Sequence, residues 1–194
     1  NPTGTTFQDT AIVSNTIYHY VISAINAAGE SPNSNQATVN PFFNSWAGTY
    51  SLAGNNALPT ANPDGDILNN LQEFAFGTNP NSNTLSNLNY TANGAVTTIG
   101  LPIIQDFDAG AATDFRAVFT RRKTYLTDGL IYTVQFSADL INWTNNIITP
   151  TILTGSGVSN PSGVEAVSVP FPAAVTSQNG SQAPRFFRVG TDVN

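Results

Sequence analysis

Short, strand-like segments separated by turn residues fill the second half of the chain and limit it to a β fold. Between residues 89 and 189, runs rich in β-branched and aromatic residues alternate with stretches of Gly, Pro, Asn and Ser. The segments with this strand pattern are Asn89–Thr91, Val96–Leu101, Asp114–Arg121, Leu130–Ser137, Thr149–Leu153, Glu165–Val169 and Arg185–Val189. Short strands at such regular intervals are typical of a sandwich. We therefore expect a mainly β protein with a C-terminal β-sandwich over residues 85–194.

A second β pattern occupies residues 1–41. It predicts three strands, at Thr5–Val13, Thr16–Asn26 and Ser34–Val39. In the second of these, the side chains from Tyr18 onward alternate between two faces with the period of two of a sandwich strand. The segment Asn26–Pro32 contains the Gly and Pro that a hairpin connection needs. We expect a small β unit that ends at residue 41.

The segment 42–84 carries helical patterns. Apolar side chains at helical spacing predict one short helix, through Phe43, Trp46, Ala47 and Tyr50. A second short helix is predicted by Leu68, Leu71 and Ala75, and it should end at Gly77, before Pro80. An acidic run lies between these patterns. The order helix, acidic loop, helix is that of an EF-hand, although the connection entering the loop is longer.

The acidic run concentrates potential metal ligands. Three of the twelve acidic residues, Asp64, Asp66 and Glu73, fall within residues 62–73. Ca²⁺ prefers about six to eight oxygen ligands, which an EF-hand loop supplies at fixed positions of a twelve-residue segment. On that grid the ligands are Asn62, Asp64, Asp66, the carbonyl of Leu68, Asn70 and a bidentate Glu73. The sequence predicts a calcium site. The alternative is a helix N-terminus that Asp64 and Asp66 cap.

The segment Thr16–Ser31 resembles the end of a fibronectin type III domain. Tyr18 stands at the position of that family's tyrosine corner. The resemblance covers only the last three strands, whereas such a sandwich has seven. It implies an apolar face with nothing opposite it, which a neighbouring domain or another copy of the chain would cover. Alternatively, the chain begins inside such a domain.

Two further resemblances concern the rest of the chain. The acidic run resembles the Asp-x-Asp-Gly-Asp-Gly-x-x-Asn-x-x-Glu pattern of dockerin, EF-hand-like and thrombospondin type 3 loops. It departs from that pattern at Asn62, which loses a charge, and at Ile67, where a β-branched residue replaces Gly and implies strain. The segments Ile131–Trp143 and Arg185–Val189 resemble the C-terminal regions of large secreted bacterial surface proteins. That resemblance implies an extracellular module without enzymatic activity.

Composition excludes several functions. Only 9% of the residues are charged and the net charge is −6, which argues against a nucleic-acid partner. Without Cys, the chain has no disulfide, thiolate metal site or Cys nucleophile. His19 is the only histidine and lacks companions for a triad, so we expect a surface residue. No run approaches the roughly 20 apolar residues of a membrane span. A looser acidic group, Asp106, Asp108 and Asp114, is expected to be a solvated loop.

These observations favour a non-enzymatic structural or adhesive module, stabilised by Ca²⁺ and located outside the cell or at the cell surface. The incomplete N-terminal unit predicts self-association, with strands from a neighbouring copy completing it into a filament or surface assembly. The alternative is a carbohydrate-binding accessory module, for which exposed aromatics around Trp143 would provide a stacking platform. Trp46 is expected in the core.

Overall fold

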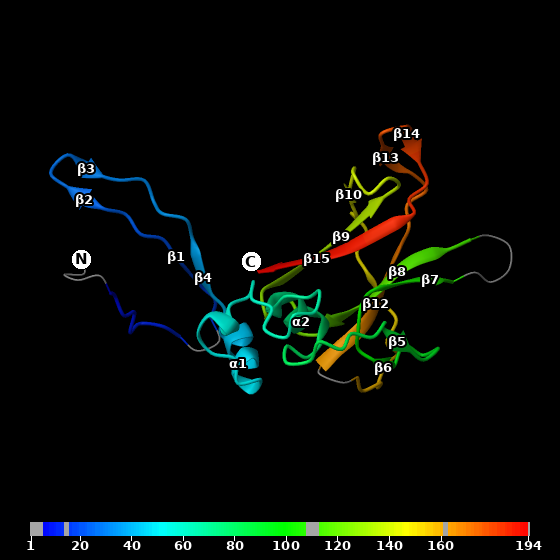
Figure 1. Ribbon diagram of the computed structural model, residues 1–194, viewed down its shortest axis with the longest axis horizontal. Coiled ribbons are helices and arrows are strands. Elements are labelled where there is room, and N and C mark those ends of the chain that lie inside the picture. The colour runs from blue at the N-terminus through cyan, green and yellow to red at the C-terminus, as the bar shows by residue number, and fades with distance from the viewer. Residues whose placement is uncertain (1–5, 14–15, 108–112, 161–162, 194) are drawn as a thin grey trace.

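The computed structural model describes residues 6–13, 16–107, 113–160 and 163–193. The fold is mainly β, as the sequence predicts. An N-terminal arm (residues 6–39), a pair of helices and a C-terminal β-sandwich follow one another along the long axis (Figure 1). Within the described parts of the chain, no helix has the length and apolar character needed to cross a membrane.

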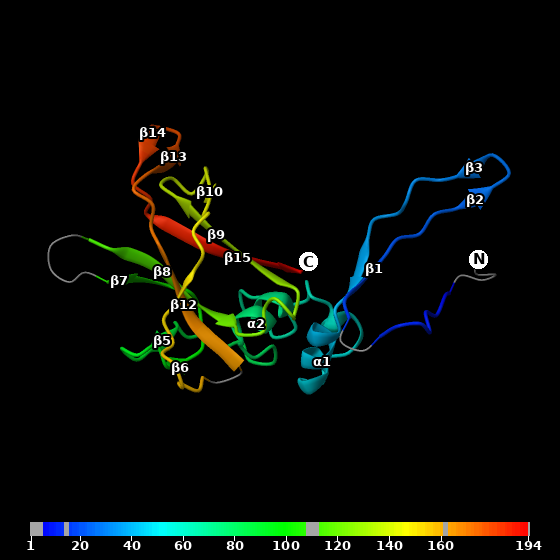
Figure 2. The same cartoon turned by 180° about the vertical axis from the view of Figure 1, so that it is seen from behind.

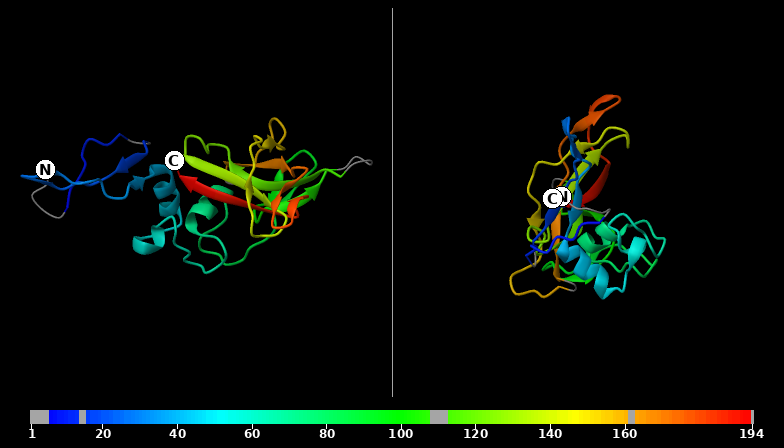
Figure 3. Two further views of the ribbon diagram at one scale, coloured as in Figure 1. Left: turned by 90° about the horizontal axis from the view of Figure 1, so that it is seen from above. Right: turned by 90° about the vertical axis from the view of Figure 1, so that its left-hand side faces the viewer.

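The arm is a narrow antiparallel ribbon. Strand β1 (Tyr18–Tyr20) pairs with β4 (Ala37–Val39), and nearer the tip β2 (Ile25–Asn26) pairs with β3 (Gly29–Glu30). The predicted hairpin turn is confirmed, and Gly29 adopts a φ of +131° there. Seen from above, the arm extends beyond the helices and away from the sandwich (Figure 3).

The prediction of a first strand at Thr5–Val13 is wrong for the residues of that segment that the structure describes. Residues 6–13 form no strand, and Thr5 lies outside the described residues. Side chains rather than a β ladder tie this segment to β1: the Val13 N–H donates to the Tyr18 hydroxyl (2.7 Å), and the Tyr20 hydroxyl donates to Asp9 (3.1 Å). The described part of the predicted segment has no backbone partner and therefore forms no strand.

The second predicted strand, Thr16–Asn26, is interrupted between β1 and β2. The N–H groups of Ile22 and Ala24 donate to the hydroxyls of Ser34 and Ser31, at 3.0 and 2.9 Å. Serine hydroxyls compete with backbone partners in this way, which interrupts a ladder.

Both predicted helices are present, but Leu68 lies before the second one and packs in the sandwich core rather than on the helix face with Leu71 and Ala75. Helix α1 (Pro41–Thr49) is capped by Asn40, and a 3-10 turn, η1 (Gly54–Ala57), follows it. Helix α2 (Asn70–Phe76) ends at Gly77, whose φ of +84° is the left-handed conformation of a C-terminal cap.

Two antiparallel sheets form the sandwich. The first has the order β11-β12-β8-β7, with β7 at Ile103–Asp106, β8 at Phe115–Arg122, β11 at Thr151–Ile152 and β12 at Val164–Pro170. The second has the order β10-β9-β15, with β9 at Leu130–Ser137, β10 at Thr144–Asn145 and β15 at Phe186–Val193. The remaining pairs are β5 (Asn89–Tyr90) with β6 (Val96–Thr98), and β13 (Val175–Ser177) with β14 (Gly180–Gln182).

Each of the seven predicted strand segments in this region overlaps a strand, and Leu130–Ser137 matches β9 from end to end. The predictions missed β7, β10, β13 and β14, which are short and polar or follow a proline. The core lies between the two sheets, where Phe119 of β8, Phe136 of β9 and Val167 of β12 are at most 1% exposed.

Helix α2 joins this core to a second one. Phe76 packs with the sandwich core, whereas Phe74 and Ala75 pack with Phe43 and Ala47 of α1. Two hydroxyls of the sandwich also bind the end of α2, because Thr120 donates to the Phe76 carbonyl and Tyr132 donates to the Ala75 carbonyl, both at 2.7 Å. Figure 2 shows α2 between α1 and the sheets.

The arm contrasts with these cores. No apolar side chain among its described residues is buried, and Phe7 and Ile22 are 74% and 76% exposed. A hollow of about 690 Å³ opens on the arm, lined in part by Phe7, Ile12, Val21 and Ile22. The apolar face expected from the sequence is present, and no other part of the described chain covers it.

Candidate metal centre

The acidic loop is folded by its own Asx side chains. The Asn62 side-chain oxygen accepts from the Gly65 N–H (2.8 Å), and the Asn62 amide donates to the Asp66 carbonyl (2.6 Å). Gly65 supplies the positive φ that the turn requires, at +78°. Ile67 has no positive φ and is 73% exposed, so the strain expected there is wrong. The left-handed residue lies two positions earlier than the resemblance suggested.

Three carboxylates converge at this loop. One oxygen each from Asp64, Asp66 and Glu73 lies within 4.8 Å of the others. Glu73, in α2, is fully buried, whereas Asp64 and Asp66 are half-buried. Burial, followed by the charges of Asp64 and Asp66, raises the pKa of Glu73 to about 8, and a 3.4 Å hydrogen bond from Thr78 opposes this only in part. In the metal-free protein, burying the Glu73 carboxyl group beside Asp64 and Asp66 therefore costs free energy.

Each aspartate uses one oxygen to fold the loop and leaves the other without a donor. Asp64 accepts from the Asp66 N–H (3.2 Å), and Asp66 accepts from the Leu68 N–H (2.6 Å). Among the described residues, six buried side-chain oxygens lack a hydrogen-bond partner, and four belong to this site: Asp64 Oδ2, Asp66 Oδ2, Asn70 Oδ1 and Glu73 Oε2. A buried polar group without a partner costs about 1–3 kcal/mol. A cation bound by the three carboxylates would supply the partner that Asp64, Asp66 and Glu73 lack.

The orientation of Asn70 is fixed from outside the acidic run. Its amide nitrogen donates to the carbonyls of Asn56 (2.7 Å) and Leu58 (2.8 Å), at the end of η1. Both amide hydrogens are therefore used, and the opposite end of the amide is the unpartnered Oδ1. Asn70 and Glu73 are three residues apart in α2, so they lie on one side of the helix.

The remaining predicted ligands lie nearby. The Leu68 side chain is buried in the sandwich core, which fixes the residue whose carbonyl is the expected ligand. Asn62 is exposed, and its oxygen already accepts from Gly65. The alternative in which Asp64 and Asp66 cap the helix is wrong, because Asn69 caps α2 in a capping box with Gln72.

Sequence reasoning missed the carbonyls of Asn56 and Leu58 and the hydroxyl of Thr78. The two carbonyls lie before the run and act on Asn70, and Thr78 lies after it and donates to Glu73. No sequence signal marks a backbone carbonyl, so only the fold reveals the first two.

Among the described residues, the second acidic group does not bring three carboxylates together as the first does. Asp108 lies outside the described residues. Asp114 is paired with Arg116 at 2.6 Å, and this contact lowers the pKa of Asp114 below its usual value. His19 is exposed, as expected, and contacts the Thr38 hydroxyl at 3.0 Å.

The tryptophans differ in environment. Trp46 packs against Phe43 and Phe74, with ring centres 5.5 Å away in each case, in agreement with the expected core position. Trp143 is half-buried, and the Arg188 guanidinium lies 4.2 Å from its ring centre. No ring–ring contact of Trp143 occurs among the described residues.

The donor set is made of carboxylate and amide oxygens, which hard cations such as Ca²⁺ prefer. The residues at 62–73 therefore fit such an ion. Comparisons of the chain with protein-family models, curated proteins and solved structures gave no match.

Proposed function

We propose that residues 62–73 bind Ca²⁺ and that the chain is a non-enzymatic structural module of a secreted or cell-surface protein. One observation carries this proposal: four buried oxygens of one loop and one helical turn lack any donor. In this role the ion holds the acidic loop on α2. Because α2 packs on both the sandwich and α1, the bound ion stabilises the junction between them.

The charge of the site favours a low-affinity calcium site. It has three carboxylates, because Asn62 stands at the first position, where the EF-hand-like pattern has a fourth acidic residue. Fewer charged ligands weaken the binding, which places the dissociation constant near the ~10⁻⁴–10⁻³ M range of extracellular modules. Mg²⁺ demands stricter octahedral geometry and retains its water, so we expect it to bind more weakly.

Thermal unfolding with Ca²⁺ and with a chelator tests this proposal. A ligand that binds only the folded state stabilises it by about 2.7 kcal/mol at a concentration 100-fold above its dissociation constant. We expect the unfolding midpoint to rise through millimolar Ca²⁺ and to fall with chelator. The variant Asp66→Asn should lose this response, and the exposed control Asp192→Asn should keep it. An unchanged midpoint in the wild-type protein would contradict the calcium site.

The open face of the arm supports a second element of the function, self-association. We propose that a second copy of the chain covers the hollow around Ile12, Val21 and Ile22, because a two-stranded ribbon without a covering layer is marginal in water. Charge favours a second copy as the partner. Asp9 and Glu30 are acidic residues of the arm, whereas all six Lys and Arg residues of the chain lie between Arg116 and Arg188.

Light scattering after size exclusion tests the association. We expect dimers or larger species that grow with concentration, and elongated assemblies by electron microscopy. Ile22→Ser should shift the distribution toward monomer, whereas Leu126→Ser, at an equally exposed leucine outside the arm, should not. A monomer at high concentration ends this part of the proposal.

The carbohydrate-binding alternative has no comparable support. Its expected platform around Trp143 is a single indole stacked with Arg188, and the indole N–H donates to the Leu140 carbonyl at 3.1 Å. That alternative stays a prediction, for which binding to a glycan array is the measurement.

A further inference from the structure

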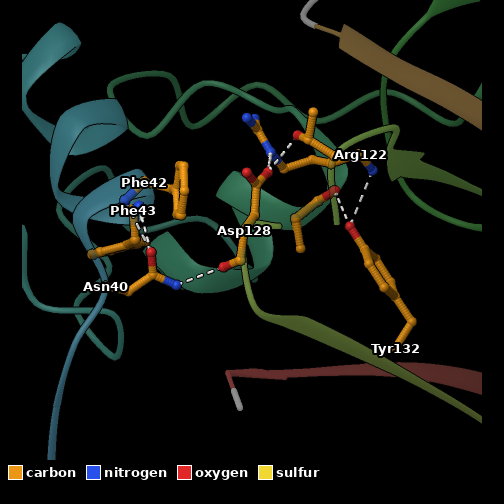
Figure 4. A network of polar contacts seen from close by, with 8 residues as sticks. Asn40, Phe42, Phe43, Arg122, Asp128 and Tyr132 are labelled. Carbon is orange, nitrogen blue, oxygen red and sulfur yellow. Dashed lines mark hydrogen bonds and ion pairs between the residues drawn. The ribbon is translucent and has the colours of Figure 1, made fainter. Parts of the chain in front are cut away.

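The arm is anchored to the turn that connects β8 to β9. Asn40, the residue between β4 and α1, is 6% exposed, and its amide donates to the carbonyl of Asp128 at 2.6 Å. The oxygen of the same side chain accepts from the N–H groups of Phe42 and Phe43, at 3.0 and 3.1 Å (Figure 4). One asparagine thus caps α1 and binds the body of the molecule.

A second contact holds the other strand of the ribbon. Gly129 adopts a φ of +68°, and a Cβ at this position would lie 2.3 Å from the Cδ1 atom of Ile17. The Ile17 side chain therefore packs directly on the Gly129 backbone; the positive φ favours glycine there, and any larger residue would have to displace the end of the Ile17 side chain. Because Ile17 precedes β1 and Asn40 follows β4, the same turn holds both strands at their base.

This turn is also connected to α2. The buried Asp128 carboxylate accepts from the Nε of Arg122 and from the Thr124 hydroxyl. The Arg122 guanidinium lies 4.3 Å from the ring centre of Phe74, the residue that follows Glu73 in α2. The backbone N–H of Arg122 donates to the Tyr132 hydroxyl at 3.2 Å, and the same hydroxyl donates to α2. Figure 4 shows the hydrogen bonds that connect Asn40, Asp128, Arg122 and Tyr132 as one network.

We propose that Ile17, Asn40, Arg122, Asp128 and Gly129 form a joint that sets the direction of the arm, and that a cation at residues 62–73 stiffens this joint through α2. The second half of this inference rests on the proposed calcium site. Without the ion, the four buried and unpartnered oxygens favour any movement that separates Glu73 from Asp64 and Asp66 and admits water between them. Such a movement shifts Phe74, against which both Arg122 and Phe43 pack. The ion removes that tendency.

Distances between spin labels measure the joint directly. The chain contains no Cys, so Asn33→Cys in the arm and Thr133→Cys in β9 introduce two specific attachment sites, both exposed. We expect a single narrow distance distribution with Ca²⁺ and a broader one with chelator. Asn40→Asp keeps the oxygen that caps α1 but removes the donor to Asp128, so it should broaden the distribution even with Ca²⁺. Gly129→Val should do the same by displacing Ile17.

The matched control is Asn44→Ala, an exposed asparagine of α1 without a side-chain hydrogen bond among the described contacts, which should leave the distribution narrow. Unchanged narrow distributions in Asn40→Asp and Gly129→Val would overturn the joint. If Ca²⁺ raises the unfolding midpoint but chelator leaves the wild-type distribution unchanged, the coupling is wrong while the calcium site stands. If Ca²⁺ has no effect on the midpoint and Asn40→Asp still broadens the distribution, the calcium site fails and the joint stands.

Discussion

Two loops of this protein are built around aspartates, and they satisfy their carboxylates in opposite ways. In the loop after β9, one oxygen of Asp139 accepts from the N–H groups of Ile141 and Asn142, at 2.9 and 2.8 Å. The other accepts from the Asn142 amide and from the N–H of Gln178, at 2.9 and 2.8 Å. These donors hold the pKa of Asp139 well below its usual range. Both oxygens of the Asp139 carboxylate therefore have hydrogen-bond donors from the protein itself.

In the acidic loop, Asp64 and Asp66 each have one oxygen bound to backbone and one without a donor, and Glu73 is buried beside them. Here the pKa of Glu73 rises to about 8. The number of protein donors per oxygen, rather than the number of acidic residues, therefore separates a structural aspartate loop from a candidate cation site. A count of acids in the sequence cannot make this distinction.

The largest expected effect is that of Glu73→Gln. Because glutamine removes a buried, crowded carboxylate, we expect the metal-free variant to be more stable than the metal-free wild-type protein. The same change should abolish the calcium-dependent gain of about 2.7 kcal/mol that the wild-type protein shows at 100-fold excess over the dissociation constant. Unfolding in urea with and without Ca²⁺ measures both. A variant that keeps the full calcium response would remove Glu73 from the site.

Asp139→Ala tests the other loop. It leaves the N–H groups of Ile141, Asn142 and Gln178 without their acceptor, so we expect an unfolding midpoint several degrees lower, by an equal amount with Ca²⁺ and with chelator. Asp139→Asn, which retains one acceptor oxygen, should give an intermediate loss. A loss that depends on Ca²⁺ would show that the two loops are not independent.

The pH dependence of stability should distinguish the two loops without any mutation. The pKa of Glu73 is raised from 4.5 to about 8 in the folded protein. Its ionisation therefore destabilises the metal-free protein above pH 8, and this penalty is relieved as the pH falls from 8 toward 4.5. Asp139, whose pKa is lowered from 3.8, contributes stability that is present above that value and is lost only below it. In chelator we expect the midpoint to rise from pH 8 to pH 5.

Two controls accompany this measurement. The rise should be absent in Glu73→Gln, and saturating Ca²⁺ should suppress it because the ion favours the ionised carboxylate. A midpoint that falls steadily from pH 8 to pH 5 in chelator would contradict the assigned direction for Glu73.

The smallest expected effect is that of Asn62→Asp. This change restores the fourth charge of the resembling pattern, and a higher ligand charge increases calcium affinity. It also removes the amide that donates to the Asp66 carbonyl, so part of the gain is lost. We expect the dissociation constant from calorimetric titration to decrease by about tenfold or less, with little change in metal-free stability. Weaker binding than in the wild-type protein would mean that Asn62 only folds the loop.

The sequence predicted those features of the fold that depend on patterns within a few neighbouring residues. The strand β9, the helix around Phe43 and the end of α2 at Gly77 follow from alternation, helical spacing and a glycine cap, all of which act over a few residues. The twelve-residue grid likewise selected the three acids that the fold brings together. Where a strand needs a partner, the pattern was insufficient: residues 6–13 were predicted to lie in a strand, yet no backbone of the described chain pairs with them.

The tertiary structure decided the rest. Burial of Glu73 and the direction of the Asn70 amide depend on the sandwich core and on carbonyls 12 and 14 residues earlier. The joint depends on Asn40 meeting Asp128, 88 positions along the chain. Local pattern thus places the oxygens of residues 62–73, whereas desolvation and the supply of donors, which distant elements determine, leave four of them unpartnered. That shortage of donors turns an acidic run into a candidate cation site.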